Sequence, residues 1–289
     1  DMEKVNNGEL TPMFFGSAMT NFGVQAFLEK FLEMSPKPQP RALQDGTMIM
    51  PENEAFSAFV FKIQANMNPA HRDRISFMRI CSGVFDKGMS VYHKQSNKVI
   101  KLAQPQQFLA QESTIFEKVY PCDIICVFDL VIFGIGDSLS DNKLKLQFED
   151  FPVFPPEIFA RVQPKDSMKR KQFEKGIIQL AQEGAIQVFE QKGVGLESYI
   201  VGVVGVLQLE VLEYRLNNEY SAQLLMNQLP YSVARWVYAE DKKLIDNIKG
   251  LDNGMLVYDT KERPVILVNN EWSLNWILER NPGIQFLTV

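Results

Sequence analysis

The sequence predicts a multi-domain protein in which an all-β barrel precedes an α+β domain of the ferredoxin-like (split βαβ) type with a C-terminal extension. The prediction depends on three observations. Proline-rich stretches interrupt the chain at residues 35–40 and 151–156. Between them, short apolar runs follow one another without a helical period, which is typical of a barrel or sandwich. After the second interruption, the elements follow the order β-α-β-β-α-β.

Composition favours a soluble globular protein. With 289 residues, of which 46% are hydrophobic, the chain is long enough for about two domains with sizeable cores. The net charge of -5 argues against general coating of nucleic acid, although a local basic patch can still contact phosphates. Three cysteines are too few for a disulfide framework, and no apolar stretch approaches the roughly 18–20 residues of a membrane span. We therefore expect a cytoplasmic protein with neither membrane nor DNA as a partner.

Residues 1–35 are expected to be the C-terminal remnant of a larger domain. A polar opening leads at once into an apolar run at 13–15, which predicts a strand, and a loop connects this strand to an amphipathic helix. One face of that helix carries Val24, Phe27, Leu28 and Phe31. Because one strand and one helix cannot form a core, this segment does not make a domain. Alternating prolines then predict an extended linker over residues 36–54.

Residues 55–150 are expected to form the β-barrel. Asn, Pro, Gly and Asp turns separate predicted strands at 56–63, 74–81, 89–92, 99–102 and 124–133.

Residues 151–289 are expected to form the α+β domain. Its first helix has Ser167 as a candidate N-cap and Gly184 as its stop, and a second helix follows at 206–218. The flanking strands are predicted at 158–162, 185–189, 199–204 and 223–229. Further strands and helices between residues 232 and 287 are predicted either to extend the same sheet or to form a small third lobe.

Motifs for catalysis and metal binding are missing from the sequence. The phosphate-cradling pattern GxxxxGK[ST] does not occur. Cys122 and Cys126 share one side of a predicted strand, but only His71 and His93 are available to complete a zinc site, and neither lies at ligand spacing. A nucleophilic triad would need the same two histidines, which lie outside any diagnostic context. We therefore predict no catalytic and no metal-binding residues for this chain.

Two basic clusters are candidate binding residues. The cluster in the barrel comprises His71, Arg72, Arg74 and Arg79. The cluster at the start of the first helix of the α+β domain comprises Lys165, Lys169, Arg170, Lys171 and Lys175. In an acidic protein, such concentrations can meet a phosphate backbone. A solvated charged face explains either cluster, taken alone, at least as well.

Four stretches of sequence carry a resemblance to a known family. They are TPMFFGSA at 11–18, FVFKIQANM at 59–67 running into HRDR at 71–74, EGAIQVF at 183–189 and VGVVGVLQ at 201–208. Together with ARWV at 234–237, they make the chain from residue 9 to 289 similar to the translational GTPases, and in particular to the bacterial branch that acts in termination. The predicted order of nucleotide-domain tail, proline linker, barrel and ferredoxin-like domain is also the order in this family.

The resemblance implies a function for the whole protein. It implies a ribosome-stimulated GTPase that uses GTP or GDP with magnesium and promotes the release and recycling of class I release factors after peptide release, in the bacterial cytoplasm. Ser17 and Ala18 match the loop that contacts the guanine base in this family, whereas the phosphate loop, both switches and the Asn-Lys-x-Asp motif have no counterpart. This chain by itself is then expected to be a ribosome-binding portion without catalysis or cofactor.

The resemblance also implies the 70S ribosome and class I release factors as partners. It assigns the barrel to the small subunit and the ferredoxin-like domain to the space between the subunits, near ribosomal protein and the bound release factor. The candidate contacts with ribosome or RNA are then Arg72, Arg74, Arg79, Lys165, Lys169, Arg170 and Lys171. A-form RNA suits such contacts, because it is recognised mainly through its backbone and shape.

Three alternatives remain open at this point. A piece of an elongation-factor-type translocase shares the barrel and the ferredoxin-like domain, but should continue into further domains beyond Val289. An unrelated binding module needs no catalysis. An enzyme with a site at Trp272, Trp276 and Arg280 is the third, although aromatic residues at i and i+4 of one helix are typical of core packing.

Overall fold

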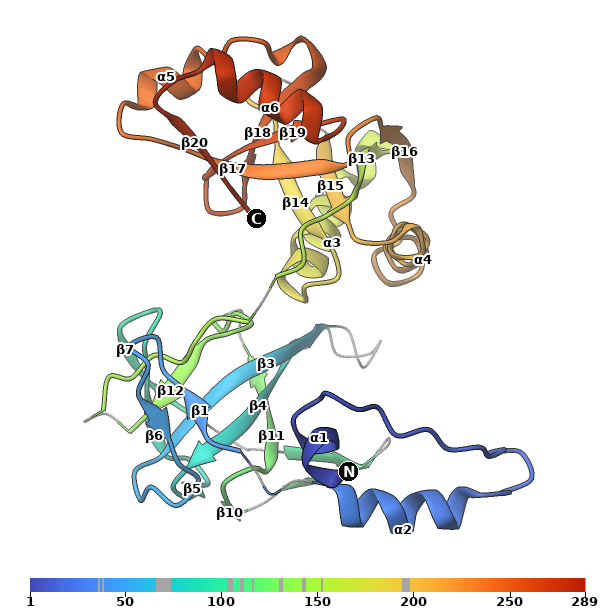
Figure 1. Ribbon diagram of the computed structural model, residues 1–289, viewed down its shortest axis with the longest axis vertical. Helices are drawn as coiled ribbons and strands as arrows, with labels where there is room; N and C mark the ends of the chain where they lie inside the picture. Colours follow the sequence, from blue (N-terminus) through green and yellow to red (C-terminus); the bar gives the residue numbers. More distant parts are fainter. Residues whose placement is uncertain are drawn as a thin grey trace.

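The computed structural model describes residues 1–35, 37, 39–65, 74–102, 106–109, 112–115, 117–129, 132–141, 144–151, 153–193 and 198–288. Over these ranges the chain forms an N-terminal helical segment, two eight-stranded sheets and two small two-stranded sheets. Figure 1 shows the first large sheet in the lower half of the molecule and the second, with its helices, in the upper half. No helix in these ranges is long and apolar enough to cross a membrane.

The N-terminal segment holds two helices, α1 (Met2–Asn6) and α2 (Val24–Met34), and neither has a buried residue. The helix predicted here is confirmed, and Phe27 packs edge-on against Phe14 with ring centroids 5.2 Å apart. The strand predicted at residues 13–15 is wrong, because these exposed residues pair with no described strand. A strand needs a neighbour that takes up its backbone hydrogen bonds.

The predicted all-β region is confirmed, and it begins before residue 55, because residues 41–49 of the predicted linker form a two-stranded hairpin whose Leu43 is buried with Phe59 and Phe148. Its strands are β1 (Arg41–Ala42), β2 (Met48–Ile49), β3 (Ser57–Ala65), β4 (Arg74–Ser82), β5 (Phe85–Asp86), β6 (Ser90–His93), β7 (Lys98–Lys101), β8 (Gln106–Leu109), β9 (Glu112–Ile115), β10 (Lys118–Val119), β11 (Ile124–Asp129) and β12 (Ser138–Ser140). The large sheet has the antiparallel order β7-β6-β12-β3-β4-β11-β8-β9, while β1 pairs with β2 and β5 with β10.

One apolar core fills the barrel. Its fully buried members include Val60, Met78, Ile80, Phe85 and Leu139. β3 and β4 are buried on both faces over part of their length, because Phe59 and Cys81 belong to a second cluster with Phe148. The strand predicted at 124–133 is described as β11 over Ile124–Asp129, and residues 132 and 133 are not part of a strand.

The predicted ferredoxin-like unit is also confirmed, and we call it the first unit. Its elements are β13 (Ile158–Pro164), α3 (Arg170–Gln182), β14 (Gln187–Glu190), β15 (Tyr199–Val203), α4 (Val206–Tyr220) and β16 (Leu224–Leu229). The strand order β16-β13-β15-β14 is that of a split βαβ fold. Both helices pack on the same face of the sheet, where the buried residues Phe173, Ile177 and Leu212 contribute to the core.

The ends of α3 follow local sequence signals. Gly184 stops the helix as predicted, with a φ of +73°, a conformation in which side chains with a Cβ are strained. The predicted N-cap is wrong by one residue: the side chain of Asp166 accepts a hydrogen bond from the backbone N–H of Met168 at 2.9 Å. A short 3-10 turn, Ser167–Lys169, then leads into α3.

The C-terminal extension repeats the topology of the first unit, and we call it the second unit. Its elements are β17 (Val233–Ala239), α5 (Lys242–Asp246), β18 (Gly254–Asp259), β19 (Pro264–Val268), α6 (Glu271–Arg280) and β20 (Ile284–Thr288). The strand order β20-β17-β19-β18 corresponds to the order β16-β13-β15-β14. Since β14 pairs with β18, both units share one sheet, and the predicted extension of that sheet is confirmed. The sequence pattern did not reveal the repeat.

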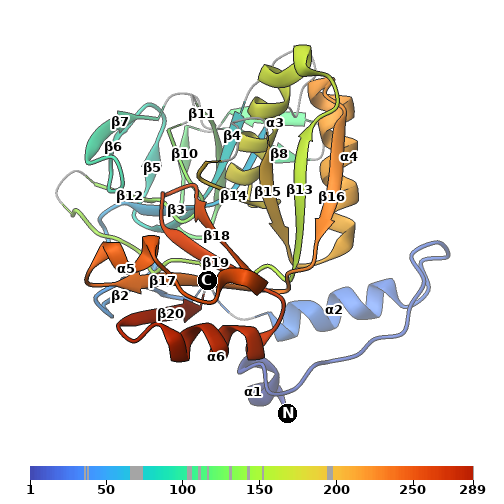
Figure 2. The same ribbon diagram turned by 90° about the horizontal axis from the view of Figure 1, so that it is seen from above.

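The two halves of this sheet pack their helix-free faces against each other. Phe159, Phe189 and Ile200 of the first unit share an apolar cluster with Val265 and Leu267 of the second. The opposite faces of the same strands lie under the helices, in separate cores for each unit. Figure 2 shows α3 with α4 and α5 with α6 on different sides of the domain. The result is a layered α/β/β/α arrangement.

Gly176 of α3 gives a test of the packing between α3 and α4. A Cβ at this position would lie 2.4 Å from Cδ2 of Leu216 and 3.0 Å from Cγ of Tyr220. We expect Gly176→Val to lower the free energy of unfolding by about 2 kcal/mol or more, because these buried side chains have no room to move away. Urea denaturation measures the change. Gly205→Ser is the control, since a Cβ there meets no atom within 4 Å, and equal losses in the two variants would contradict this packing.

Candidate functional site

Five cations surround the N-terminal end of α3 and form what we call the α3 basic surface. It comprises Lys165, Lys169, Arg170, Lys171 and Lys175. Lys165, Lys171 and Lys175 are exposed, and the last two lie one helical turn apart, on the same side of α3. Lys169 and Arg170 are half-buried, and Arg170 forms an ion pair with Glu174 at 2.7 Å. The positive end of the helix dipole adds to the local potential.

Of the basic cluster predicted in the barrel, the structure describes Arg74 and Arg79. His71 and Arg72 lie outside the described residues. Arg79 is partly exposed and donates to the backbone O of Gln39 in the linker at 3.5 Å. Arg74 is only 5% exposed, and its guanidinium donates to Oε1 of Gln182 at 3.0 Å. Arg74 therefore points into the junction between β4 and α3.

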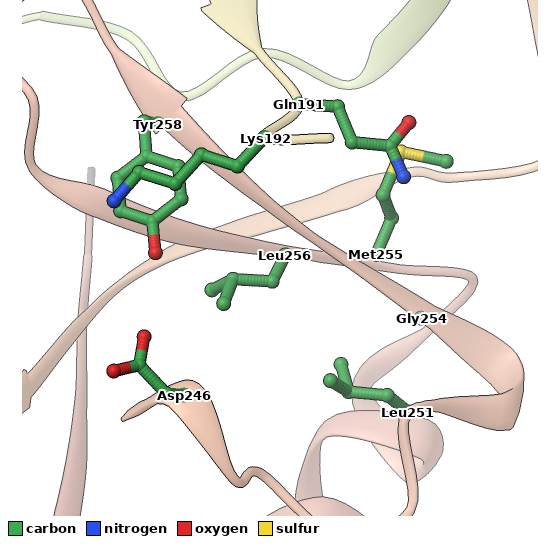
Figure 3. Close-up of a pocket in the computed structure, with 8 residues that line it drawn as sticks. All are labelled: Gln191, Lys192, Asp246, Leu251, Gly254, Met255, Leu256 and Tyr258. Atoms are coloured by element: carbon green, nitrogen blue, oxygen red, sulfur yellow. The ribbon is translucent and has the colours of Figure 1, made fainter. Parts of the chain in front are cut away.

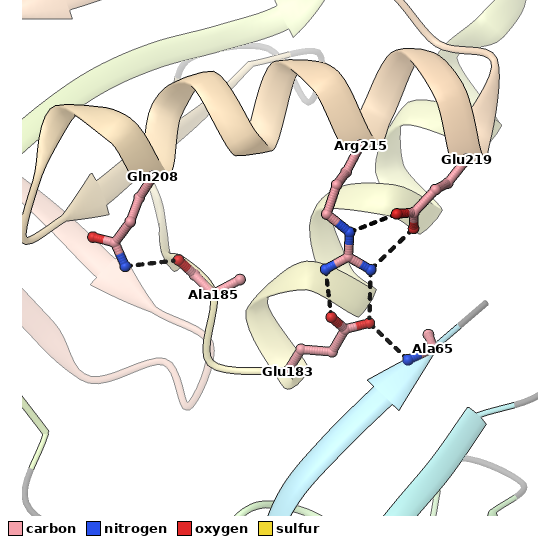
Figure 4. Close-up of polar contacts among 6 residues, drawn as sticks. All are labelled: Ala65, Glu183, Ala185, Gln208, Arg215 and Glu219. Atoms are coloured by element: carbon pink, nitrogen blue, oxygen red, sulfur yellow. Dashed lines mark hydrogen bonds and ion pairs between the residues drawn. The ribbon is translucent and has the colours of Figure 1, made fainter. Parts of the chain in front are cut away.

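The C-terminal end of α3 holds the barrel through two consecutive residues, Gln182 and Glu183. Ala65 and Arg74 face each other as register partners on β3 and β4. Glu183 accepts the backbone N–H of Ala65 at 2.8 Å, while Gln182 accepts from Arg74. Figure 4 shows the carboxylate of Glu183 reaching the end of β3. We refer to this junction as the α3 clamp.

Arg215 of α4 binds the carboxylate of Glu183 and so stabilises the clamp. Its guanidinium forms a two-point ion pair with Glu183, at 2.5 and 3.2 Å, and also binds Glu219 at 2.7 and 2.9 Å (Figure 4). Burial alone would lower the pKa of Arg215, but its hydrogen bonds to Glu219 and Glu183 and the charges of these carboxylates raise it. The guanidinium therefore stays charged and fixes the orientation of Glu183. The sequence did not predict this network. One of the two barrel groups that it binds is the backbone amide of Ala65, and a backbone amide leaves no pattern of residue types.

Ser17 and Ala18, which match the guanine-contacting loop, lie in a closed turn near the N-terminus. The backbone N–H of Ser17 donates to the O of Phe22 at 2.9 Å. The glycines that flank the turn allow this closure, since a Cβ on Gly16 would lie 2.9 Å from the same oxygen and Gly23 has a φ of +73°. The loop thus keeps a defined backbone shape, and Ser17 is half-buried whereas Ala18 is exposed.

The cysteines and the charged groups show no catalytic grouping among the described residues. Burial raises the pKa of Cys81 to about 12, so this thiol stays protonated. Cys122 lies in the turn before β11 with a φ of +79°, and not on a strand beside Cys126 as expected. In the part of the chain that the structure describes, no group of three His, Cys, Asp or Glu residues is placed to hold a metal ion.

A pocket of about 420 Å³ lies where the first and second units join, near the pairing of β14 with β18. It is lined by Gln191, Lys192, Asp246, Leu251, Gly254, Met255, Leu256 and Tyr258 (Figure 3). The ammonium of Lys192 lies 3.8 Å from the centroid of the Tyr258 ring. The titratable side chains of its lining are those of Asp246, Lys192 and Tyr258.

Glu183 is the residue on which the clamp depends. We expect Glu183→Ala to lower the free energy of unfolding by about 2–3 kcal/mol, because it leaves Arg215 partly buried with one carboxylate only. Amide hydrogen exchange at Ala65 should become faster, since its acceptor is removed. Glu183→Gln keeps an acceptor for that amide and should restore much of its protection.

Glu219→Gln is the matched control, because Glu219 binds the same guanidinium but not the barrel. We expect it to cost about 0.5 kcal/mol, as for an i, i+4 ion pair, with unchanged exchange at Ala65. Two results would show that the clamp does not hold β3. They are faster amide exchange at Ala65 in the Glu219→Gln control, and an unchanged exchange rate at Ala65 in Glu183→Ala.

Comparisons with known proteins agree with this architecture. Residues 55–142 match the family model for elongation factor G domain 2, and residues 148–278 match that for the class II release factor RF3, C-terminal domain. A crystal structure of a protein from Thermus thermophilus shares the fold with a TM-score of 0.61 at 18% identity, over 83% of this chain and 36% of that one.

Curated relatives extend the match to almost the whole sequence. A peptide chain release factor 3 from Symbiobacterium thermophilum is 50% identical over 286 residues, which are 99% of this chain and 53% of the relative. Those of Ligilactobacillus salivarius and Enterococcus faecalis are both 44% identical, over 99% of this chain and 53% and 54% of their own lengths. The resemblance found in the sequence is thereby confirmed, and the chain is a relative of the bacterial peptide chain release factor 3 proteins that spans about half of their length.

Proposed function

We propose that this chain is the ribosome-binding portion of a translation-termination GTPase that promotes the release and recycling of class I release factors after peptide release. The observation that carries the proposal is the identity of 44–50% with peptide chain release factor 3 proteins over 99% of the chain. The bacterial relatives support a bacterial cytoplasmic location. The 70S ribosome and class I release factors are the proposed partners.

The α3 basic surface is the proposed contact with ribosomal RNA. Three of its lysines are exposed, and the described residues show no ion pair for them. A phosphate backbone suits such a surface, because lysine ammonium groups bind phosphates as point charges and need no base sequence. In this proposal, the first unit lies between the ribosomal subunits and the barrel lies on the small subunit.

Through the α3 clamp, the proposed contact between the α3 basic surface and ribosomal RNA would also affect the barrel. The 13 residues of α3 span about 20 Å at the usual rise per residue. One end of the helix carries the basic surface, and the other end holds β3 and β4 through Glu183 and Gln182. A contact made at the N-terminal end is therefore connected rigidly to the barrel. We propose that α3 fixes the orientation of the barrel when the first unit binds.

In this proposal, the whole protein binds and hydrolyses the nucleotide, and this chain alone does not. The loop closed by Ser17 and Phe22 is the proposed guanine-side loop, because Ser17 and Ala18 match the guanine-contacting loop of the family. GTP or GDP would bring magnesium, for which the described residues contain no suitable cluster. We propose that this chain positions the guanine-side loop and the ribosome contacts, and that the remaining half of its relatives supplies the phosphate site.

Ribosome pelleting at stepped salt tests the basic surface. We expect the variant Lys165→Glu/Lys171→Glu/Lys175→Glu, which changes the three exposed lysines, to bind 70S ribosomes more weakly. The slope of log affinity against log salt should fall by roughly 2–3, because each lost phosphate contact removes about 0.7–0.9.

The control changes the net charge by the same amount elsewhere. Lys242, Lys243 and Lys249 are exposed residues of the second unit, and their triple change to Glu should leave the salt slope nearly unchanged. Equal retention of the α3 variant and the unaltered chain would remove the α3 basic surface from the proposal.

A second test concerns catalysis. We expect the purified chain to hydrolyse GTP at the rate of a buffer blank, with or without 70S ribosomes, because no phosphate loop or switch occurs in its sequence. A malachite-green phosphate assay measures this. Turnover that rises when ribosomes are added would contradict the assignment as a binding portion.

An elongation-factor-type translocase is the second candidate, and the match of the barrel to elongation factor G domain 2 favours it. The match of residues 148–278 to the release factor model favours termination instead. Displacement of a labelled class I release factor from ribosomes by a full-length protein, compared with translocation by the same protein, separates the two activities.

A further inference from the structure

The tryptophans of α6 are exposed, but a guanidinium already engages them. Trp272 and Trp276 stack with ring centroids 5.6 Å apart, and the guanidinium of Arg280 lies over Trp276. Their exposed fractions of 67% and 41% show that the core packing expected from their spacing is wrong. A set of unpaired backbone groups lies elsewhere in the second unit, on strand β18.

Strand β18 has a partner along almost its whole length on one side, but only at its end on the other. From Gly254 to Tyr258, each residue has a register partner on β19. On the other side, the register with β14 covers only Tyr258 and Asp259. Within the ranges that the structure describes, no strand pairs with residues 254–257 on that side. A short open edge is therefore present inside an eight-stranded sheet, and we call it the β18 edge.

A turn after β14 leaves this edge open. β14 ends at Glu190, and Gly193 in the following turn has a φ of +82°, a conformation that strains residues with a Cβ. At the same turn, the ammonium of Lys192 lies over the Tyr258 ring, 3.8 Å from its centroid. The pocket of about 420 Å³ lies between this turn and β18 (Figure 3). The β18 edge therefore faces the pocket.

The β18 edge presents the backbone N–H and C=O of Leu256. Pro264 has no N–H, so its register partner Tyr258 does not form a hydrogen-bonded pair with β19. In an antiparallel ladder, hydrogen-bonded and non-hydrogen-bonded pairs alternate. The backbone groups of Leu256, two positions from Tyr258, therefore point away from β19 and toward the pocket, whereas those of Val257 point to β19. A donor and an acceptor exposed in this way are a template for another strand.

Hydrogen bonds hold both walls of the pocket in place. On one wall, Arg161 donates to Oε1 of Gln191 at 2.8 Å, which fixes that side chain beside Met255. On the other, the backbone of Lys249 exchanges two hydrogen bonds with the side chain of Asn281, at 2.8 and 2.9 Å. These two bonds fix the segment that follows α5. A site with its walls already in place loses little conformational freedom on binding.

The lining of the pocket suits an extended peptide. Leu251 and Leu256 give it an apolar side, while Lys192 and Asp246 contribute one charge of each sign. A phosphate backbone gains little from such a balanced pair of charges. A volume of 420 Å³ accommodates a few residues of a strand, which rises by about 3.3 Å per residue. The walls admit a single segment, whereas the sheet edge of a second folded copy would bring its own neighbouring strands with it.

We propose that the β18 edge binds an extended segment of a protein partner by strand addition. The segment pairs with the N–H and C=O of Leu256 and places an apolar side chain against Leu251 and Leu256. Backbone pairing supplies the affinity, and the apolar side of the pocket supplies the preference for one side chain. This site goes beyond the proposed ribosome contact and is separate from the α3 basic surface, because it binds a peptide backbone and not phosphates.

Amide hydrogen exchange, followed by NMR on the full chain, tests whether the edge is open. The amide of Leu256 should exchange about tenfold faster or more than that of Val257, because only the latter is paired with β19. Slow exchange at Leu256 that becomes faster on dilution would show that a second copy covers the edge. Slow exchange at every concentration would show that the chain itself covers it. Either result would overturn the proposal.

A blocked pentapeptide, acetyl-Thr-Val-Thr-Val-Thr-amide, is the probe for strand addition, because its alternating β-branched residues favour an extended backbone and carry no charge. At ten times its dissociation constant, it should slow exchange at Leu256 about tenfold, since only the free fraction exchanges. The matched control peptide carries a methyl group on every backbone nitrogen and cannot donate a hydrogen bond. It should leave the exchange rate unchanged, and equal slowing by both peptides would exclude strand addition.

A second edge of the same sheet shows whether the pocket matters. β16 is a terminal strand, and Lys165 donates to the backbone O of Gln223 at 2.9 Å just before it. By the same alternation, the N–H of Met226 points away from β13 and is an edge donor. The peptide should leave exchange at Met226 unchanged, because the pocket walls lie beside Leu256. Equal slowing at both amides would mean general association with sheet edges, against the proposal.

Substitutions at Leu256 separate the backbone from the side chain. Leu256→Pro removes the N–H that faces the pocket and spares the bonds to β19, a position at which an edge strand tolerates proline. By isothermal titration calorimetry, it should bind the pentapeptide about tenfold more weakly or worse, because the backbone pairing is lost. Leu256→Ala keeps the N–H and should lose only about threefold, through its smaller apolar contact.

Urea denaturation shows whether each variant is folded. If Leu256→Pro does not fold, the comparison of the two peptides on the unaltered chain decides the question alone. Equal affinity of the pentapeptide for a folded Leu256→Pro variant and for the unaltered chain would show that the β18 edge is not its site. These results are independent of ribosome pelleting with the α3 variant, so a failure here leaves the proposed ribosome contact untouched.

Discussion

The packing of two sheet faces against each other is the constraint on which the C-terminal half depends. Each ferredoxin-like unit covers one face of its four strands with helices and leaves the other apolar. Phe159 and Phe189 of the first unit and Val265 and Leu267 of the second bury that remaining face together. The pairing of β14 with β18 adds backbone hydrogen bonds along the join. Neither unit could expose its bare face to water without losing the burial of a whole layer.

The α3 clamp connects this double unit to the barrel with few atoms. A single carboxylate, Glu183, accepts a backbone amide of β3 and is itself held by Arg215. Charged groups at such a junction stabilise it only when all of them are satisfied, because an unpaired buried charge is costly. The clamp therefore fixes which residues meet at the junction, and adds little to the free energy of unfolding. It determines which end of α3 belongs to the barrel and which end stays open to a partner.

The sequence predicted those features that local chemistry decides. Short alternating or wholly apolar runs located several strands of both sheets, although β8, β9 and β12 were not predicted. Gly184 marked the end of α3, because a left-handed φ follows the helix there. The features it missed depend on contacts distant in the chain. The run at residues 13–15 is apolar enough for a strand but lacks a neighbour. Trp272 and Trp276 share a helix face, yet their spacing cannot say which face of α6 the core covers. The amide of Ala65 has no signature in the sequence at all.

The back-to-back arrangement of the two units has a consequence for how the domain can meet its surroundings. Because the helix-free faces are joined in the middle, the helices of the first unit and those of the second point in different directions. The start of α3 presents lysines, whereas α6 presents carboxylates beside tryptophans. Duplication of a single topology has thus produced a body with a helical surface on each of two sides, so one surface can contact a neighbour without covering the other.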